Sequence, residues 1–174
     1  KDLKKPHEVI DIVTTPDGSP VAMVHCNNCT SDLNAWVNLF KEFEEIMGIP
    51  VDMGKLFTNL FNVALKGNPD CGGIMSYNYV SGEPVTGFAD GRPLFVRSAN
   101  DKFNLANFMR AIISGAISVL KVGNDILFNE EKIKVDRITG HGGLFTTPGV
   151  GQRILGAALN SPISCMKTAG EGGP

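Results

Sequence analysis

Apolar residues follow two different periods along this chain, and the period separates strands from helices. A run rich in β-branched residues (9–14) is followed by the turn Pro16-Asp17-Gly18 and by a second apolar run (20–26). Two such runs joined by a turn of this composition predict a β-hairpin. Three further short strands are predicted at residues 74–79, 132–139 and 162–166.

Elsewhere, apolar residues recur every three or four positions, which predicts helices. The first helix begins near Leu33, with Thr30 or Ser31 as its N-cap, and ends before Gly48 and Pro50. Other helices are predicted over residues 53–66, 104–127 and 148–158. The 104–127 helix has the strongest apolar stripe of the chain: Leu105, Phe108, Met109, Ile112, Ile113, Ile117 and Leu120.

The order of these elements indicates an α/β fold. A hairpin and two helices come first, and then strands alternate with helices in the manner of parallel crossover connections. Residues 80–100 carry several Gly and Pro residues and are too long for a simple connection, so we expect them to be functional or to pack on a neighbour. Residues 1–174 contain no internal repeat and no linker, and we interpret them as one domain.

Composition narrows the function. The chain has 174 residues, of which 43% are hydrophobic and 20% charged, with 16 Lys and Arg against 18 Asp and Glu. This is globular composition, and the net charge of -2 provides no basic surface for nucleic acid or an anionic membrane. The apolar run 112–120 is broken by Ser and Gly and is too short to span a membrane. Four cysteines are too few for a disulfide scaffold, so we expect a cytoplasmic protein.

Cys26 and Cys29 form a C-x-x-C pair between the hairpin and the first helix. A helix N-terminus activates such a dithiol in thioredoxin-like redox proteins, and the pair also supplies half of a zinc site. Cys71 and Cys165 stand alone rather than as a second pair, so the sequence assigns no metal ligands. The simplest interpretation is two small buried residues at a turn.

A glycine-rich turn follows the strand predicted at 132–139, with Gly140, Gly142 and Gly143 around His141. Such a turn lets a ligand approach the bare backbone. It is not a dinucleotide fingerprint, because Phe145 replaces the required third glycine. No G-K-[ST] triplet indicates a phosphate-binding loop either.

Several segments, taken in order, resemble the C-terminal domain of the FGGY carbohydrate kinases, and within that family the xylulokinases. They are the loop 79–84 with Gly82-Glu83-Pro84, a helix with Arg110-Ala111 and Gly115, the pair Gly142-Gly143, Gln152 after it, and the strand-forming segment 160–166. Together they cover nearly the whole chain.

The resemblance implies half of an actin-like, ribonuclease H-like ATPase. It implies that ATP, accompanied by Mg²⁺, phosphorylates a pentulose, D-xylulose giving D-xylulose 5-phosphate. This domain would hold the adenosine, and the N-terminal domain would hold most of the sugar. The positions that carry over as nucleotide-binding are Gly142, Gly143, Thr147, Thr30 and Ser31.

The resemblance also implies absences. The catalytic Asp and the first strand of the domain would precede Lys1, and a final helix would follow Pro174. No residue of this chain is then the general base, and the fragment alone would be inactive. A sheet without its first strand leaves residues 10–14 with an open edge. We expect that edge to pair with another chain or fragment, unless the two groups of strands pair directly. A redox protein using Cys26 and Cys29, or a non-catalytic actin-like binding module, are the alternatives.

Overall fold

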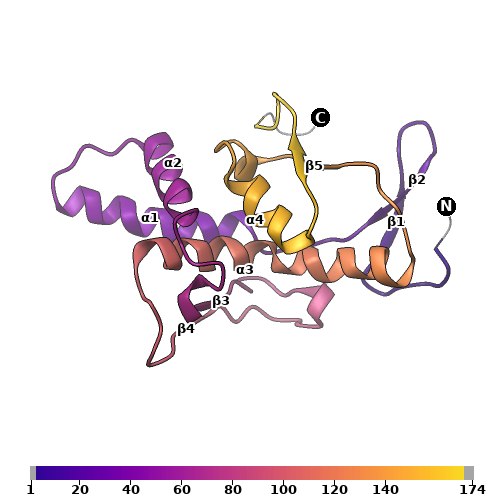
Figure 1. Cartoon of the computed structure of the whole chain (residues 1–174), viewed down its shortest axis with the longest axis horizontal. Helices are drawn as coiled ribbons and strands as arrows, with labels where there is room; N and C mark the ends of the chain where they lie inside the picture. Colours follow the sequence, from indigo (N-terminus) through magenta and orange to yellow (C-terminus); the bar gives the residue numbers. More distant parts are fainter. Residues whose placement is uncertain (1–2, 171–174) are drawn as a thin grey trace.

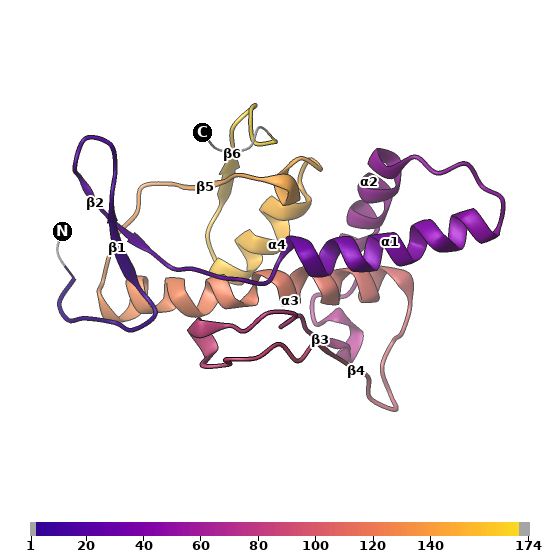
Figure 2. The same ribbon diagram turned by 180° about the vertical axis from the view of Figure 1, so that it is seen from behind.

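One long helix organises the structure. The computed structural model describes residues 3–170. In it, α3 (Leu105–Asp125) lies between α1, α2 and α4 on one side and the strands β3 and β4 on the other (Figures 1 and 2). Asn104 caps this helix by accepting a hydrogen bond from the backbone N–H of Asn107 at 2.9 Å. Its apolar residues are buried on several sides, which explains why its apolar stripe is so wide.

Three further helices complete the core. They are α1 (Thr30–Ile46), α2 (Met53–Ala64) and α4 (Val150–Leu159), and all three contact α3. The largest buried cluster combines residues of the four helices: Leu33, Val37, Leu56, Leu60, Phe61, Ala64, Phe108, Met109, Ile112, Ile113, Ala116, Ile117, Val150, Ile154 and Leu155. The four predicted helices are therefore confirmed, and they share one core.

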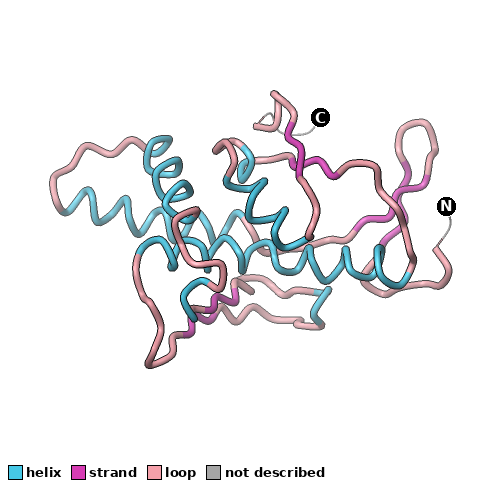
Figure 3. Tube along the Cα trace, in the orientation of Figure 1, coloured by secondary structure: helices cyan, strands magenta, loops and turns pink. Residues whose placement is uncertain are grey.

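Within residues 3–170 the strands are short and form three separate pairs (Figure 3). β1 (Asp11–Thr14) and β2 (Pro20–Met23) are antiparallel, with Ile12 opposite Ala22. β3 (Met75–Tyr77) and β4 (Leu94–Val96) are also antiparallel. β5 (Ile138–Gly140) and β6 (Ile163–Cys165) are parallel, with α4 as the crossover between them. The predicted hairpin and the parallel crossover are both confirmed.

The strand predicted over residues 132–139 is wrong except at its end. The α3 helix continues as a π-helical segment, Ile126–Glu130, and Lys132 then adopts a positive φ of 56°. The backbone N–H of Ile133 donates to the carbonyl of Leu127 at 3.0 Å. The chain thus wraps around the helix end, which an extended strand cannot do, and only Ile138 and Thr139 of the predicted segment join β5.

The long loop predicted over residues 80–100 contains structure that the sequence pattern missed. β4 lies within it, and a 3-10 helix covers Pro84–Thr86. Two arms of the loop run close together because Gly82 and Gly91 have no side chains. A Cβ atom at Gly91 would lie 1.9 Å from the carbonyl oxygen of Val80, and one at Gly82 would lie 2.2 Å from that of Ala89. The loop is therefore a tightly closed arm.

Two helix starts differ from the prediction. Cys29, and not Thr30 or Ser31, is the N-cap of α1, and no side chain forms a capping hydrogen bond there. At α4 the cap is Gly149 with a positive φ of 82°, so Pro148 lies just outside the helix. In neither case does a capping side chain mark the start of the helix, so the sequence signal for an N-cap fails there.

Gly115 allows α3 to approach β3, as its place in the Ser114-Gly115-Ala116 segment indicates. A Cβ atom there would lie 2.6 Å from the carbonyl oxygen of Ser76. Gly123 plays the same part further along, where a Cβ atom would lie 2.3 Å from the side chain of Val24. Gly115 thus lets α3 pack closely on β3, and Gly123 lets it pack on the segment that follows β2.

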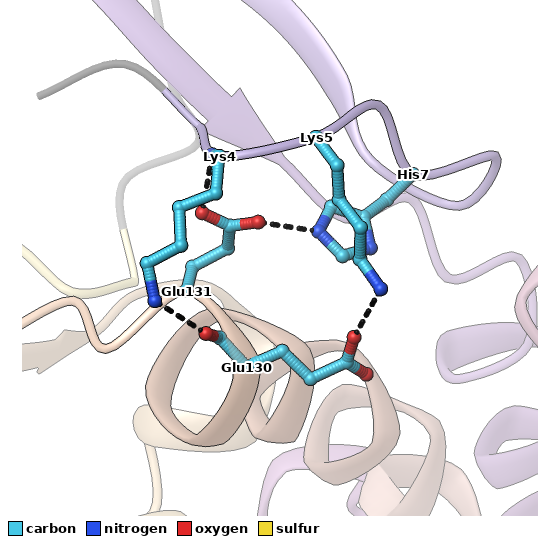
Figure 4. A network of polar contacts seen from close by, with 5 residues as sticks. All are labelled: Lys4, Lys5, His7, Glu130 and Glu131. Atoms are coloured by element: carbon cyan, nitrogen blue, oxygen red, sulfur yellow. Dashed lines mark hydrogen bonds and ion pairs between the residues drawn. The ribbon is translucent and has the colours of Figure 1, made fainter.

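A polar network fastens the segment before β1 to the end of the long helix (Figure 4). The buried Glu131 carboxylate accepts from the backbone N–H of Lys4 at 2.6 Å and lies 2.7 Å from Nε2 of His7. Lys5 forms an ion pair with Glu130 at 2.9 Å. The hydrogen bonds from Lys4 and His7 lower the pKa of Glu131. The hairpin is therefore anchored through its leading segment.

By length and composition alone, the helix over Leu105–Glu130 could cross a membrane. It is also the helix that forms the core, and the core helix of a soluble protein passes the same test. The finding is therefore weak evidence for a membrane span.

The β1–β2 pair does not join β5 and β6, so the direct pairing considered as an alternative does not occur among residues 3–170. All four residues of β1 are exposed, and Ile12 is 56% exposed.

Candidate functional site

A cavity of about 490 Å³ opens where three segments meet beside α1. The first segment is the start of α1, the second is one face of α2, and the third is the glycine-rich turn after β5. Its lining consists of Cys29, Thr30, Leu33, Asn34, Gly54, Phe57, Thr58, Phe61, Gly143, Leu144, Thr146 and Thr147. This volume is that of a small-molecule site.

The glycine-rich turn forms one wall. Gly142 has a φ of 97°, which favours glycine, and its N–H donates to the carbonyl of Ala169 at 2.8 Å. The 3-10 helix Gly143–Phe145 follows. A Cβ atom at Gly143 would meet no atom of the described residues within 4 Å, so this backbone is open to a ligand.

Phe145 stabilises the turn from behind. Cβ atoms at Gly140 and Gly151 would lie 2.3 Å and 2.8 Å from its ring, so both glycines leave room for it. The phenyl ring thus fills the space between the strand end and α4. Phe145 stands where a dinucleotide fingerprint requires a glycine. Its packed ring gives the turn a fixed shape.

The α2 wall supplies aromatic surface. Phe57 and Phe61 lie one helical turn apart with ring centroids 5.7 Å from each other, and Gly54 of the same helix also lines the cavity. Asp52 caps this helix by accepting from the N–H of Lys55 at 3.1 Å. The cap and the packing of Phe61 into the core fix the position of the wall.

Among residues 3–170, the lining contains no Asp, Glu, Lys, Arg or His. Its polar groups are hydroxyls, an amide, a thiol and backbone, and its apolar groups are Leu33, Leu144 and the two phenyl rings. Such a surface suits an uncharged ligand with a flat apolar face and several hydroxyl or amino groups. Among the described residues it offers a phosphate group no cationic side chain, and only the backbone N–H groups at the start of α1 favour an anion.

Three of the five residues that the resemblance assigned to nucleotide binding line this cavity: Gly143, Thr147 and Thr30. They come from segments more than 110 residues apart in the sequence. Gly142 and Ser31 are immediate neighbours of lining residues but do not line the cavity themselves. The whole α2 wall and Asn34 were missed, because a helix face of Phe, Thr and Gly looks like ordinary packing surface in a sequence.

Asp32 lies on the first turn of α1, outside the lining. It is buried, and its Oδ2 atom has no hydrogen-bond partner in the described part of the chain. Burial raises its pKa, and a hydrogen bond from Trp36 partly offsets that effect. Within residues 3–170, no group of three His, Cys, Asp or Glu residues could hold a metal ion. The cavity therefore offers no carboxylate ligand for Mg²⁺.

The two thiols of the C-x-x-C pair are not activated. Burial raises the pKa of Cys26 to about 11, with the nearby carboxylate of Glu83 adding to the effect. Burial also raises the pKa of Cys29, aided by the charge of Asp32. A redox-active dithiol needs the opposite shift. The raised thiol pKa values therefore argue against the redox alternative and favour the structural interpretation of the pair.

With this geometry in place, the comparisons identify the family. Residues 2–173 match the FGGY family of carbohydrate kinases, C-terminal domain. The chain belongs to that family. No curated protein sequence matches the chain.

Solved structures share the fold at low sequence identity. Xylulose kinase from Bifidobacterium adolescentis superposes with a TM-score of 0.64 at 16% identity, over 92% of this chain and 29% of that one. Xylulose kinase from Rhodospirillum rubrum gives 0.59 at 16% identity, over 78% of this chain and 25% of that one. Plasmodium falciparum glycerol kinase with ADP gives 0.52 at 18%, over 63% and 22%. This chain thus spans less than a third of the kinases it matches, and its mixture of helices and strands agrees with an actin-like fold.

The thiols give a direct test of the local environment. Because Cys26 reacts only as the thiolate, its alkylation rate at pH 7 should be about 10⁻⁴ of the limiting rate and should rise about tenfold per pH unit up to pH 11. Iodoacetamide kinetics between pH 7 and pH 11, followed by peptide mass spectrometry, measure this rate. Cys29→Ser is the control for the contribution of the neighbouring thiol. A rate that reaches its plateau below pH 8 would restore the redox interpretation.

Proposed function

We propose that this domain binds the adenosine part of ATP and is the nucleotide-holding half of an ATP-dependent sugar kinase. The observation that supports this most strongly is the uncharged cavity of about 490 Å³ beside the open backbone of Gly143, in a chain of the FGGY carbohydrate kinase family. The ADP named with the similar glycerol kinase agrees with the ligand class.

In this proposal the adenine ring lies between apolar walls. Leu33 and Phe57 face it from the two helices, and Gly143 gives it a surface of bare backbone. Thr30 and Thr147 provide hydroxyls for the ribose or the base edge, and Gly142 and Ser31 support the two walls. The charge-free lining puts the phosphates outside the cavity.

The chain's own role in the reaction is then to bind and to orient. Holding adenosine in a fixed place positions the γ-phosphate for attack by a sugar hydroxyl, and positioning supplies a large part of the rate in phosphoryl transfer. The general base and the groups that hold Mg²⁺ with the phosphates belong to other parts of such an enzyme. In this proposal the 174 residues alone are inactive.

We propose a pentulose as the sugar, with D-xylulose converted to D-xylulose 5-phosphate. Two of the similar structures are xylulose kinases. Gluconate kinase from Lactobacillus acidophilus is similar as well, at 24% identity over 63% of this chain and 22% of that one with a TM-score of 0.51, so likeness alone does not select the sugar. The cytoplasm is the compartment that the composition and cysteine content favour.

The separated strand pairs support a further part of the proposal. β1 and β2 carry four exposed apolar side chains, Ile12, Val13, Val21 and Met23. An isolated two-stranded ribbon is only marginally stable in water, and pairing with a further strand would stabilise it. We propose that the open edge of β1 pairs with a strand from another chain or fragment.

Gly143 tests the nucleotide site. In the complete kinase, Gly143→Val should raise KM for ATP about tenfold or more and leave KM for the sugar within about twofold, because the new side chain occupies only the adenosine space. Gly143→Ala should give a smaller effect in the same direction. Both variants should keep the wild-type melting temperature, since no protein atom lies within 4 Å of the new Cβ. An unchanged KM for ATP in both variants would exclude this cavity as the site.

The strand edge is tested by the mass of the chain in solution. We expect light scattering to show concentration-dependent association of the 174-residue chain, because an open edge recruits another strand. Ile12→Lys should reduce the association, since a charged edge discourages pairing. Ile46→Lys is the matched control, because Ile46 is 83% exposed but lies on α1. A wild-type chain that stays monomeric at every concentration contradicts this part of the proposal.

A further inference from the structure

A carboxylate that the proposed chemistry does not use is completely buried. Glu83 is 0% exposed, although it lies in a loop. Its backbone closes the tip of the arm: its N–H donates to the carbonyl of Phe88 at 2.7 Å, and its own carbonyl accepts from Phe88 at 3.2 Å. This arm is the one that Gly82 and Gly91 allow to close tightly. The carboxylate is therefore held by a rigid support.

The Glu83 carboxylate reaches across to the segment before α1. Its Oε2 atom accepts hydrogen bonds from the backbone N–H of Asn27 and from Nδ2 of Asn28, both at 3.1 Å. No Lys, Arg or His within residues 3–170 forms an ion pair with it, and its Oε1 atom has no hydrogen-bond partner. Burying a carboxylate charge among neutral partners costs free energy. The hydrogen bonds from Asn27 and Asn28 and the rigid arm must therefore hold the Glu83 carboxylate in place.

The same arm holds Asn28 from every side. The Asn28 Oδ1 atom accepts from the N–H of Ser81 at 2.8 Å, and its carbonyl accepts from Nδ2 of Asn78 at 2.6 Å. Nδ2 of Asn27 also donates to the carbonyl of Gly82 at 3.0 Å. Two segments at least 50 residues apart are thus joined through the buried amides of Asn28 and Asn78, the exposed amide of Asn27 and one buried carboxylate.

We call the contact of Glu83 with Asn27 and Asn28 the clamp. The residues that follow Asn28 in the sequence line the cavity. Asn28 precedes Cys29 and Thr30, which line it, and Leu33 and Asn34 continue the same wall. Cys29 is the N-cap of α1 but provides no side-chain cap. The start of the helix therefore depends on the residues just before it for its position, and Glu83 is the acidic group that holds them.

We propose that Glu83 is a positioning residue for nucleotide binding. It fixes Asn27 and Asn28, and through them the first turn of α1, at the distance from Gly143 that the ligand requires. This inference rests on the proposed function, since it takes adenosine as the ligand of the cavity. Glu83 itself touches neither nucleotide nor sugar in this account.

The test is a set of variants in the complete kinase. Glu83→Ala should raise KM for ATP about tenfold or more while KM for the sugar stays within about twofold, because a wall that shifts by a fraction of an ångström loses binding geometry. Glu83→Gln keeps one carbonyl oxygen in the same place and should stay within about threefold of the wild-type KM for ATP. Glu42→Ala is the matched control, since Glu42 is an exposed acid on α1 itself, and it should leave both constants unchanged.

Two further measurements keep the test decisive. If Glu83→Ala fails to fold, Asn28→Ala, Glu83→Gln and the double variant that combines them replace it. Non-additive effects of the two substitutions on KM for ATP then support the clamp. If Gly143→Val raises KM for ATP but Glu83→Ala behaves like Glu42→Ala, the positioning role is wrong and the nucleotide site remains. If Gly143→Val has no effect either, the proposed function itself is wrong. A Glu83→Ala variant that lowers kcat alone, with KM for ATP unchanged, would also overturn the inference.

Discussion

The burial of α3 on several sides is the constraint on which the rest of the structure depends. Its apolar stripe is too wide for one partner, so α1, α2 and α4 pack on one side while β3 and β4 pack on the other. Gly115 lets β3 approach closely, and Gly123 does the same for the segment after β2. Because α1 and α2 share α3 as their support, their ends are brought to the glycine-rich turn that leads into α4. The cavity is the space that these three walls leave open.

The apolar pattern predicted the elements that this core requires. All four helices and the hairpin follow from apolar spacing and turn residues, since these signals are local. The predicted strand at 132–139 failed because the positive φ of Lys132 and the π-helical turn before it depend on how the end of α3 is packed. β4 was missed for the same reason: three residues become a strand only when β3 lies beside them.

The candidate site was predictable on one side only. Gly143, Thr147 and Thr30 followed from the resemblance to a family, in which ordered motifs carry over by position. Phe57 and Thr58 could not be found in that way, because no motif marks them and their role comes from where α2 is placed. Glu83 was visible as a lone acid in a loop, but its burial is a tertiary property that local sequence does not encode. In the proposed enzyme, the uncharged lining can select the adenine base, and other parts of the enzyme bind the phosphates.

A crystal structure of the complete kinase with a non-hydrolysable ATP analogue tests the central claim most directly. The account predicts the adenine ring inside the cavity, within about 4 Å of the Gly143 backbone and of the Phe57 ring, with the phosphates outside it. The account is contradicted if the base lies in another depression, such as the one between α3 and β3 lined by Ser76 and Ser114, while this cavity holds only water.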